Sequence, residues 1–229
     1  FYVVVTDDLQ AATPAVLNVT VNPIDDPAII TGDFNATIDE DGVATGDLNA
    51  SDIEGLTDGA YFTLSTAPAH GTATIHPQSG NWTYTPSANY FGNDVFQVTV
   101  TDDLQGTTPA LLQITVNPVD DPAIITGDFN ATINEDGVAN GDLNAVDIEG
   151  LTDGSYFSVF IPPAHGTITI HPVTGNWTYT PDPNHFGNDS FYVVVTDDLQ
   201  AATPAVLNVT VNPIDDPAII TGDFNATID

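Results

Sequence analysis

The sequence predicts an all-β protein made of tandem β-sandwich modules, and three observations lead to this prediction. First, the chain repeats with a period of 95 residues, so that the segment VTDDLQ begins at Val5, Val100 and Val195. Second, apolar and polar residues alternate through short runs rich in Thr, Val and Ile, which is the period of half-buried strands. Third, turn residues separate these runs at intervals of about 8–12 residues, as in sandwiches of short strands.

A second, longer period overlies the first. Residues 1–39 are identical to residues 191–229, at a spacing of 190, whereas the two complete units between them differ at roughly a quarter of positions. Both ends of the chain therefore fall inside a module, and we expect the natural chain to continue or neighbouring molecules to supply the missing strands. The expected modules are 1–24 (the last two strands of one module), 25–119 and 120–214 (complete), and 215–229 (the first strand of another).

The first complete module is expected to contain seven strands. In the sixth, Phe96, Val98 and Val100 alternate with polar residues, and in the fifth Trp82 and Tyr84 alternate with Thr. The segment HPQSGN at 76–81 is a hairpin turn between the fourth and fifth strands. Seven short antiparallel strands indicate a sandwich of immunoglobulin type. In chain order the strands are expected near Ala28–Thr37, Ala44–Ala50, Ala60–Ser65, Gly71–His76, Asn81–Thr85, Val95–Thr101 and Ala110–Val116.

The composition excludes several classes of function. The chain has 32 acidic residues and no Lys or Arg, which gives a formal net charge of −32. Nucleic acid is excluded as a partner because its phosphates require basic side chains. The absence of Cys excludes disulfides, thiolate metal sites and a Cys nucleophile. No apolar run is long enough to span a membrane. The carboxylates are therefore left to cations from solution.

The acidic residues recur in the loops at the two ends of each module. Because successive loops between antiparallel strands lie at opposite ends, the acids at the end of one module and the start of the next should meet at one junction. At the junction between the complete modules these are Glu40, Asp41, Asp94, Asn117, Asp120, Asp121, Asp147, Glu149, Asp197 and Asp198. The equivalent candidate ligands at the other junctions are Asp25, Asp26, Asp52, Glu54, Asp102, Asp103, Glu135, Asp136, Asp189, Asp215 and Asp216.

Such a junction predicts bound Ca²⁺. Two carboxylates about 8 Å apart repel by roughly 0.5 kcal/mol in water, and summed over about eight groups the repulsion approaches the stability of a domain. Calcium takes six to eight oxygen ligands in flexible geometry. Without Cys or clustered His, softer metals are disfavoured. The alternative is that the acidic loops only keep the surface solvated.

Four motifs carry a resemblance to a known family: ATGDLNASDIEG, GNWTYTP, NYFGNDVFQVTVTDD and VNPVDDPA. Over its whole length the chain resembles the cadherin-like and VCBS-type tandem repeats of giant bacterial extracellular adhesins, including RTX adhesins. By this resemblance calcium would be held by Glu40, by Asp94, by the linker pair Asp120 and Asp121, and by Asp147 with Glu149. Asn93-Asp94 and the linker NPVDDP depart from the cadherin pattern, which leaves the ligand set and the number of ions open.

Other candidate sites have simpler explanations. His70, His76, His165 and His171 recur at turns without converging partners, so packing is favoured over a zinc or catalytic role. Trp82 and Trp177 share a strand face with a Tyr, which favours core packing over a sugar platform. Paired carboxylates could suggest a glycoside hydrolase, but they lie on repeated loops with no basic or aromatic cleft. We therefore do not expect an enzyme.

The expected function is that of a structural segment in a large extracellular adhesin or cell-surface fibre, stiffened by calcium at each junction, in cell adhesion or biofilm. Its partners would be neighbouring modules, other copies in a fibre, and polysaccharide or host ligands bound by domains elsewhere in the protein. An alternative is a filament-forming or polysaccharide-binding repeat whose module faces mediate assembly or ligand binding. A third possibility is a spacer attached to a secreted enzyme.

Overall fold

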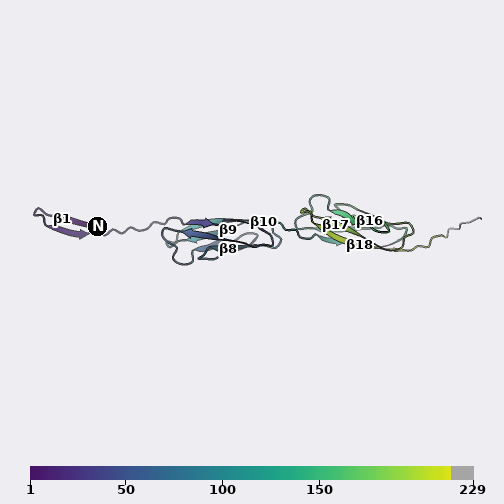
Figure 1. The fold of residues 1–229 in the computed structure, drawn as a ribbon, viewed down its shortest axis with the longest axis horizontal. Helices are drawn as coiled ribbons and strands as arrows, with labels where there is room; N and C mark the ends of the chain where they lie inside the picture. The colour runs from purple at the N-terminus through teal and green to yellow at the C-terminus, as the bar shows by residue number, and fades with distance from the viewer. Residues whose placement is uncertain (218–229) are drawn as a thin grey trace, which may run out of the picture. The chain divides into compact units, whose positions relative to one another are not determined.

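A computed structural model describes residues 1–217, and the regular elements among them are all strands. The chain divides into two compact units, Phe1–Pro118 and Val119–Asp229, and each contains one β-sandwich (Figure 1). The prediction of an all-β protein with tandem sandwich modules is confirmed. Within the described part of the chain there is no helix that is long and apolar enough to cross a membrane.

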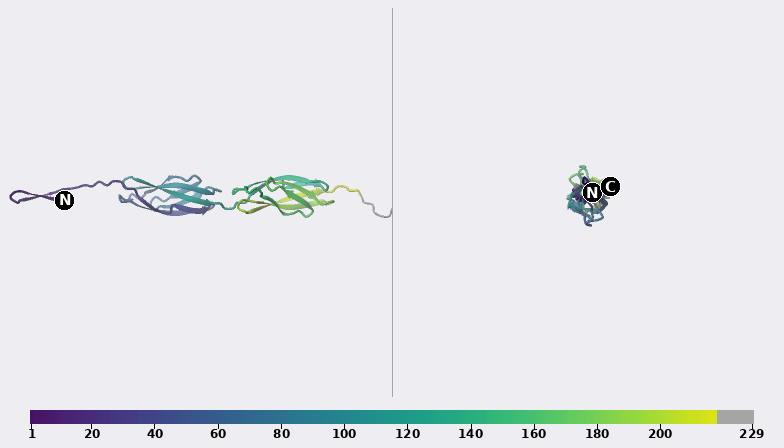
Figure 2. Two further views of the ribbon diagram at one scale, coloured as in Figure 1. Left: turned by 90° about the horizontal axis from the view of Figure 1, so that it is seen from above. Right: turned by 90° about the vertical axis from the view of Figure 1, so that its left-hand side faces the viewer.

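The first sandwich consists of two four-stranded sheets, which form the two layers visible in the left-hand view of Figure 2. One sheet has the order β3 (Ile29–Gly32), β5 (Ala44–Ser51), β8 (Asn81–Pro86), β7 (Gly71–Ile75). The other has the order β4 (Asn35–Asp39), β10 (Thr107–Asn117), β9 (Gly92–Thr101), β6 (Phe62–Thr66). All pairings are antiparallel except that of β4 with β10, which is parallel.

The second sandwich repeats this topology strand for strand. Its first sheet has the order β11 (Ile124–Gly127), β13 (Ala139–Val146), β16 (Asn176–Pro181), β15 (Gly166–Ile170). Its second sheet has the order β12 (Asn130–Asn134), β18 (Ala202–Asn212), β17 (Gly187–Thr196), β14 (Phe157–Ile161). Each sandwich is thus a complete two-sheet unit.

The expected single first strand, Ala28–Thr37, is wrong in one respect: it is two strands that belong to different sheets. The chain leaves β3 at Gly32, whose φ of 123° favours glycine. Asp33 then donates its backbone N–H to the carbonyl of Asp47 (2.8 Å), and the chain crosses to pair with β10 as β4. The other six expected strands correspond to β5 through β10.

Aromatic side chains fill the core between the sheets. Trp82 and Tyr84 project from β8 and pack against Phe96 of β9, with ring centroids 5.8 and 6.3 Å from it. The Trp82 indole donates its N–H to the carbonyl of Asp33 (3.1 Å), so its polar atom is satisfied although the side chain is 1% exposed. The second sandwich buries Trp177, Tyr179 and Phe191 in the same way. The preference for a core role over a sugar platform is confirmed for both Trp residues.

The N-terminal segment forms a two-stranded hairpin of β1 (Tyr2–Thr6) and β2 (Ala12–Val16). Its sequence is identical to that of residues 191–206, which lie in the longer strands β17 and β18. The register is also the same, because Tyr2 pairs with Val16 as Tyr192 pairs with Val206. Every residue of the hairpin strands is exposed, whereas Phe191, Val193 and Val195 are buried in the sandwich.

The close contact of Gly46 with Trp82 gives a test of the core. A Cβ at Gly46 would lie 2.5 Å from Cζ2 of the indole, so Gly46→Ala should force the ring to move. We expect a loss of about 1–3 kcal/mol in the free energy of unfolding of the first sandwich, measured by calorimetry. Thr45→Ala, on the exposed side of the same strand, is the control. Equal stability of the two variants would contradict this packing.

Candidate metal centre

Each sandwich carries a group of carboxylates at the end where the chain enters it, here called the N-terminal cluster. The linker before the sandwich supplies two of them, the loop after β5 or β13 supplies two, and the loop after β9 or β17 supplies one. The members in the first sandwich are Asp25, Asp26, Asp52, Glu54 and Asp102. The members in the second sandwich are Asp120, Asp121, Asp147, Glu149 and Asp197.

The two acids of the loop after β5 are held side by side by the backbone. Asp52 accepts the N–H of Glu54 at Oδ1 (2.8 Å), and Asp147 accepts the N–H of Glu149 in the same way (3.0 Å). In the second sandwich the linker joins them, because Asp121 donates its N–H to Glu149 Oε2 (3.3 Å).

The remaining oxygens of these acids are buried and have no hydrogen-bond donor in the structure. They are Asp52 Oδ2, Glu54 Oε2, Asp147 Oδ2 and Glu149 Oε1. Buried polar atoms are nearly always satisfied by a donor, water or an ion. One oxygen of each corresponding acid is orphaned in both sandwiches, so the arrangement is a property of the repeat.

The electrostatics of the cluster are repulsive. Burial raises the pKa of Glu54, and the neighbouring Asp52 raises it further. Burial and then the charge of Asp102 likewise raise the pKa of Asp25. In the second sandwich the pKa values of Asp120 and Glu149 are raised, in each case first by burial and then by acidic neighbours. At neutral pH the charged cluster therefore lowers the stability of the fold unless a cation is bound.

The opposite end of each sandwich presents one buried glutamate. Glu40, at 4% exposed, follows β4 and donates its backbone N–H to the carbonyl of Asn117 (3.0 Å). Glu135, at 6% exposed, donates likewise to Asn212 (3.0 Å). The Glu135 carboxylate also accepts the N–H of Ile214 at Oε1 (2.6 Å). The glutamate is thus fixed to the segment that leads to the next linker.

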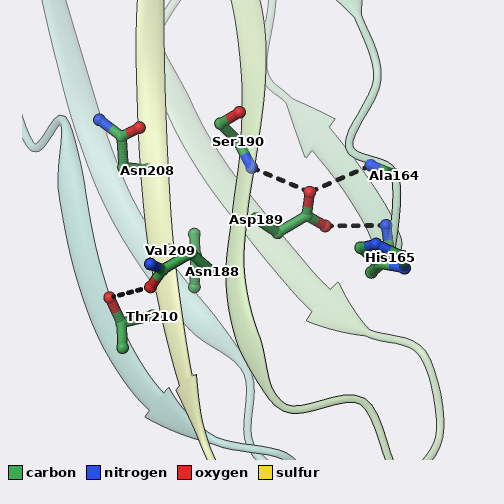
Figure 3. Close-up of a pocket in the computed structure, with 8 residues that line it drawn as sticks. All are labelled: Ala164, His165, Asn188, Asp189, Ser190, Asn208, Val209 and Thr210. Carbon is green, nitrogen blue, oxygen red and sulfur yellow. Dashed lines mark hydrogen bonds between the residues drawn. The ribbon is translucent and has the colours of Figure 1, made fainter.

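Asp94 and Asp189, which were predicted as metal ligands, occupy a different environment, shown for Asp189 in Figure 3. The Asp189 carboxylate accepts the backbone N–H groups of Ala164, His165 and Ser190 (2.9–3.1 Å) and the Tyr179 hydroxyl (3.0 Å). Asp94 has the corresponding partners, including Tyr84 at 3.0 Å. Burial alone would raise the pKa of each Asp, but these hydrogen bonds outweigh it and lower the pKa. Both oxygens already stabilise the fold of their own sandwich.

Asp103 and Asp198 connect two loops. Asp103 accepts the N–H of Thr57 at Oδ1 (2.8 Å) and its hydroxyl at Oδ2 (2.6 Å). Asp198 makes the same two contacts with Thr152. The hydroxyl bond is the main reason that the pKa of each carboxyl is lowered. Sequence reasoning missed these threonines because neither lies near its partner in the chain.

The other predicted ligands lie outside the two clusters' contacts. The Asn117 carbonyl accepts the backbone N–H of Glu40, and the Asn117 side-chain amide donates to the Asp39 carboxylate (3.3 Å). Asp41 and Asp136 are exposed in the loops that follow β4 and β12. Asp215 and Asp216 are exposed after β18. Most of the predicted final strand, residues 218–229, lies outside the described residues.

The N-terminal cluster is suited to a hard divalent cation. Its donors are carboxylate oxygens, some already fixed in place by backbone N–H groups and some orphaned. Calcium prefers such oxygens and adapts to irregular geometry. Asp52 with Glu54, or Asp147 with Glu149, would hold the ion together with the linker acids. A soft metal finds no thiolate in this chain.

Comparisons with known proteins agree with the repeat architecture. Residues 25–115 match the family model of a bacterial Ig domain, and residues 120–213 match that of a bacterial cadherin-like domain. No curated protein sequence matches the chain.

Several solved cadherin structures are similar in fold. Extracellular cadherin domains 1–5 of protocadherin gamma B2 align with a TM-score of 0.57 at 11% identity, over 83% of this chain and 40% of that one. Mouse cadherin-23 EC22–24 aligns with a TM-score of 0.55 at 14% identity, over 84% of this chain and 68% of that one. The chain spans 40% and 48% of the length of two protocadherin gamma B2 structures that it matches. At these identities the similarity concerns the fold alone.

The Asp189 pocket predicts a stability loss on Asp189→Asn. An amide cannot accept all of the hydrogen bonds that the carboxylate accepts, so buried N–H groups lose a partner. We expect unfolding of the second sandwich to become easier by about 2–4 kcal/mol. Because the pKa of Asp189 is lowered, its contribution is present above the ordinary value of 3.8 and is lost as the pH falls below it. The difference between wild type and variant, followed by calorimetry, should therefore shrink in acid. Exposed Asp136→Asn is the control.

The N-terminal clusters predict the opposite pH dependence in the metal-free chain. For groups with a raised pKa, the stabilising effect is complete below their ordinary values, 3.8 for Asp and 4.5 for Glu, and is lost as the pH rises through the raised values. Melting temperatures should therefore fall as the pH rises from about 4.5 towards 7. A flat profile in metal-free buffer would contradict the repulsion.

Proposed function

Because the chain is a tandem array of bacterial Ig-like and cadherin-like modules, we propose that it is a structural segment of an extracellular adhesin or surface fibre whose junctions bind Ca²⁺. The observation that carries the calcium assignment is the set of orphaned carboxylate oxygens in the N-terminal cluster. Such oxygens occur in Asp52 and Glu54 and again in Asp147 and Glu149, so each junction would bind the ion in the same way.

The contacts at the C-terminal end of the second sandwich support a junctional location for the ion. Glu135 binds the backbone N–H of Ile214, and the next two residues are Asp215 and Asp216. Through the 95-residue repeat these two acids are the equivalents of Asp120 and Asp121, which join the N-terminal cluster of the following module. An extended chain advances about 3.3–3.6 Å per residue. Asp215 and Asp216 follow directly after Ile214, which is bound to Glu135, so the linker acids of the next module begin close to this glutamate.

A bound ion would convert a repulsive linker into a fixed one. Without the cation, the charged linker acids repel those of the loop after β5 or β13, and the linker samples many conformations. With the cation, oxygens of both modules would coordinate one ion, and the angle between the modules would be restricted. A row of such junctions would extend as a stiff rod that presents other domains of the protein away from the cell. The role of the chain would then be structural.

Small-angle scattering tests the proposal. The fragment 25–217, which contains both sandwiches, should show a narrower distribution of shapes and a larger maximum dimension in CaCl₂ than in chelator. Isothermal titration with CaCl₂ should give binding that Asp147→Asn combined with Glu149→Gln weakens by at least about tenfold. The control Asp128→Asn removes a charge beside Trp177, in a groove of the second sandwich, and should bind as wild type does. No calcium binding, or binding without a change in scattering, would overturn the junctional role.

A further inference from the structure

The outer face of one sheet in the second sandwich carries a row of exposed apolar side chains. Tyr192 of β17 pairs with Val206 of β18 on one side and with Ile161 of β14 on the other. These residues are 36%, 39% and 45% exposed. The register shifts between Val159 and Ile161, and this bulge leaves Phe160, at 65% exposed, beside the same row.

The first sandwich is polar at three of these four positions and has Leu111 at the fourth, that of Val206. Its residues at the positions of Ile161 and Tyr192 are Thr66 and Gln97, and Thr66 donates its hydroxyl to the Gln97 amide oxygen (3.3 Å). The position of Phe160 is Ser65, which donates its hydroxyl to the backbone carbonyl of Gln97 (3.1 Å). The fold therefore does not require apolar residues at the positions of Phe160, Ile161 and Tyr192, and their presence in the second sandwich needs another explanation.

The apolar row lies on a face without charge. The other outward positions of β12, β14, β17 and β18 hold Asn, Ser, Thr, Pro, Ala or Val. The acid within these strands, Asp189, points inward and is satisfied there. In a chain with a net charge of −32, this face is one on which carboxylates do not oppose association.

The same pair of strands recurs along the chain. Tyr2 pairs with Val16 in the hairpin of β1 and β2, in the register of Tyr192 and Val206 and 190 residues earlier. Gln97, paired with Leu111, lies between them in the sequence, so the aromatic residue of this pair is replaced by a polar one while its partner stays apolar. The aromatic residue at the centre of this face therefore alternates with Gln along the chain, at Tyr2, Gln97 and Tyr192.

We propose that the face formed by Phe160, Ile161, Tyr192 and Val206 binds the same face of a second copy of the chain. A cationic partner would find no carboxylate to pair with on this face. A second copy supplies an uncharged apolar row with a rim of Asn, Ser and Thr, and it keeps the acidic ends of both chains away from the contact. A two-fold axis through the row would place each Tyr192 against the partner's apolar residues.

The size of the face predicts a weak contact that repetition strengthens. The strands β12, β18, β17 and β14 contain 5, 11, 10 and 5 residues. At a spacing of about 4.8 Å they present roughly 500 Å², less than the roughly 800 Å² per partner of a standard stable interface. A single pair of faces would dissociate readily. An array that presents the face on alternate modules would gain from the high effective concentration of each further contact.

Residue exchange between the two sandwiches tests the proposal in the fragment 25–217, where each sandwich has its own complete core. Phe160→Ser, Ile161→Thr and Tyr192→Gln together place the first sandwich's residues on the second. The matched control Ser65→Phe, Thr66→Ile and Gln97→Tyr makes the reciprocal change. Each set of residues already occurs at the equivalent positions of the other sandwich, so both variants should fold. Circular dichroism verifies this. Sedimentation equilibrium is measured up to about 0.5 mM protein, in CaCl₂ and in chelator.

We expect a reversible dimer whose dissociation constant rises at least about tenfold in the first variant, and additional association in the reciprocal one. The dimer should form in both buffers, so this result is independent of calcium binding. A strictly monomeric fragment, or a dimer that the exchange does not weaken, would overturn the proposal. Retention in a neutral polysaccharide gel that the exchange abolishes, by a fragment that stays monomeric, would instead assign the face to carbohydrate.

Discussion

The constraint on which the structure depends is that carboxylates must be stabilised without any Lys or Arg side chain. With 32 acids and no Lys or Arg, only N–H groups, hydroxyls, water and dissolved cations remain. Asp94 and Asp103 show the first solution, in which backbone N–H groups and a Tyr or Thr hydroxyl occupy both oxygens. Asp52 and Glu54 are not fully stabilised in this way, because one oxygen of each is buried without a hydrogen-bond donor. The division between these two groups separates acids that build a sandwich from acids that are available to connect sandwiches.

Much of the fold could be predicted because its signals are local. Alternation in β8 through β10 and the turn residues between strands define six strands without reference to their partners. The division of the first strand at Gly32 could not be predicted, because it depends on pairing with Asp47 and with β10, both distant in the sequence. The hairpin of β1 and β2 also shows that strand length and burial depend on contacts distant in the sequence. An identical sequence forms longer strands with buried side chains when a second sheet packs against it.

The candidate site was predicted in outline for a similar reason. The repeat and the order of strands assign each acidic loop to an end of its module, which identified the members of the N-terminal cluster. Sequence alone could not separate Asp94 from Asp52, since both are acids in or beside a loop. The difference lies in Ala69 and His70, whose N–H groups reach Asp94 from about 25 residues earlier. The apolar face of the second sandwich was missed, although one signal was present: Ser65, Thr66 and Gln97 are all replaced by apolar or aromatic residues one repeat later.

The two sandwiches share the residues of the N-terminal cluster and the aromatic residues of the core but differ on the outer face of one sheet. This distribution suits two roles, a junction between modules and a contact between chains. The acids of the N-terminal cluster and the buried glutamate are the same in both sandwiches, as are the core residues Trp82 and Tyr84 and their counterparts. The proposed calcium-binding junction would require this, because each module would complete the site of its neighbour whichever version it is. The outer face formed by Phe160, Ile161, Tyr192 and Val206 has no such requirement. An array with this face on every module would expose apolar surface along its whole length, which favours indiscriminate association. Alternating Gln with Tyr at the centre of the proposed face would limit contact to every second module, so chains would associate in a defined register while every junction remained equivalent.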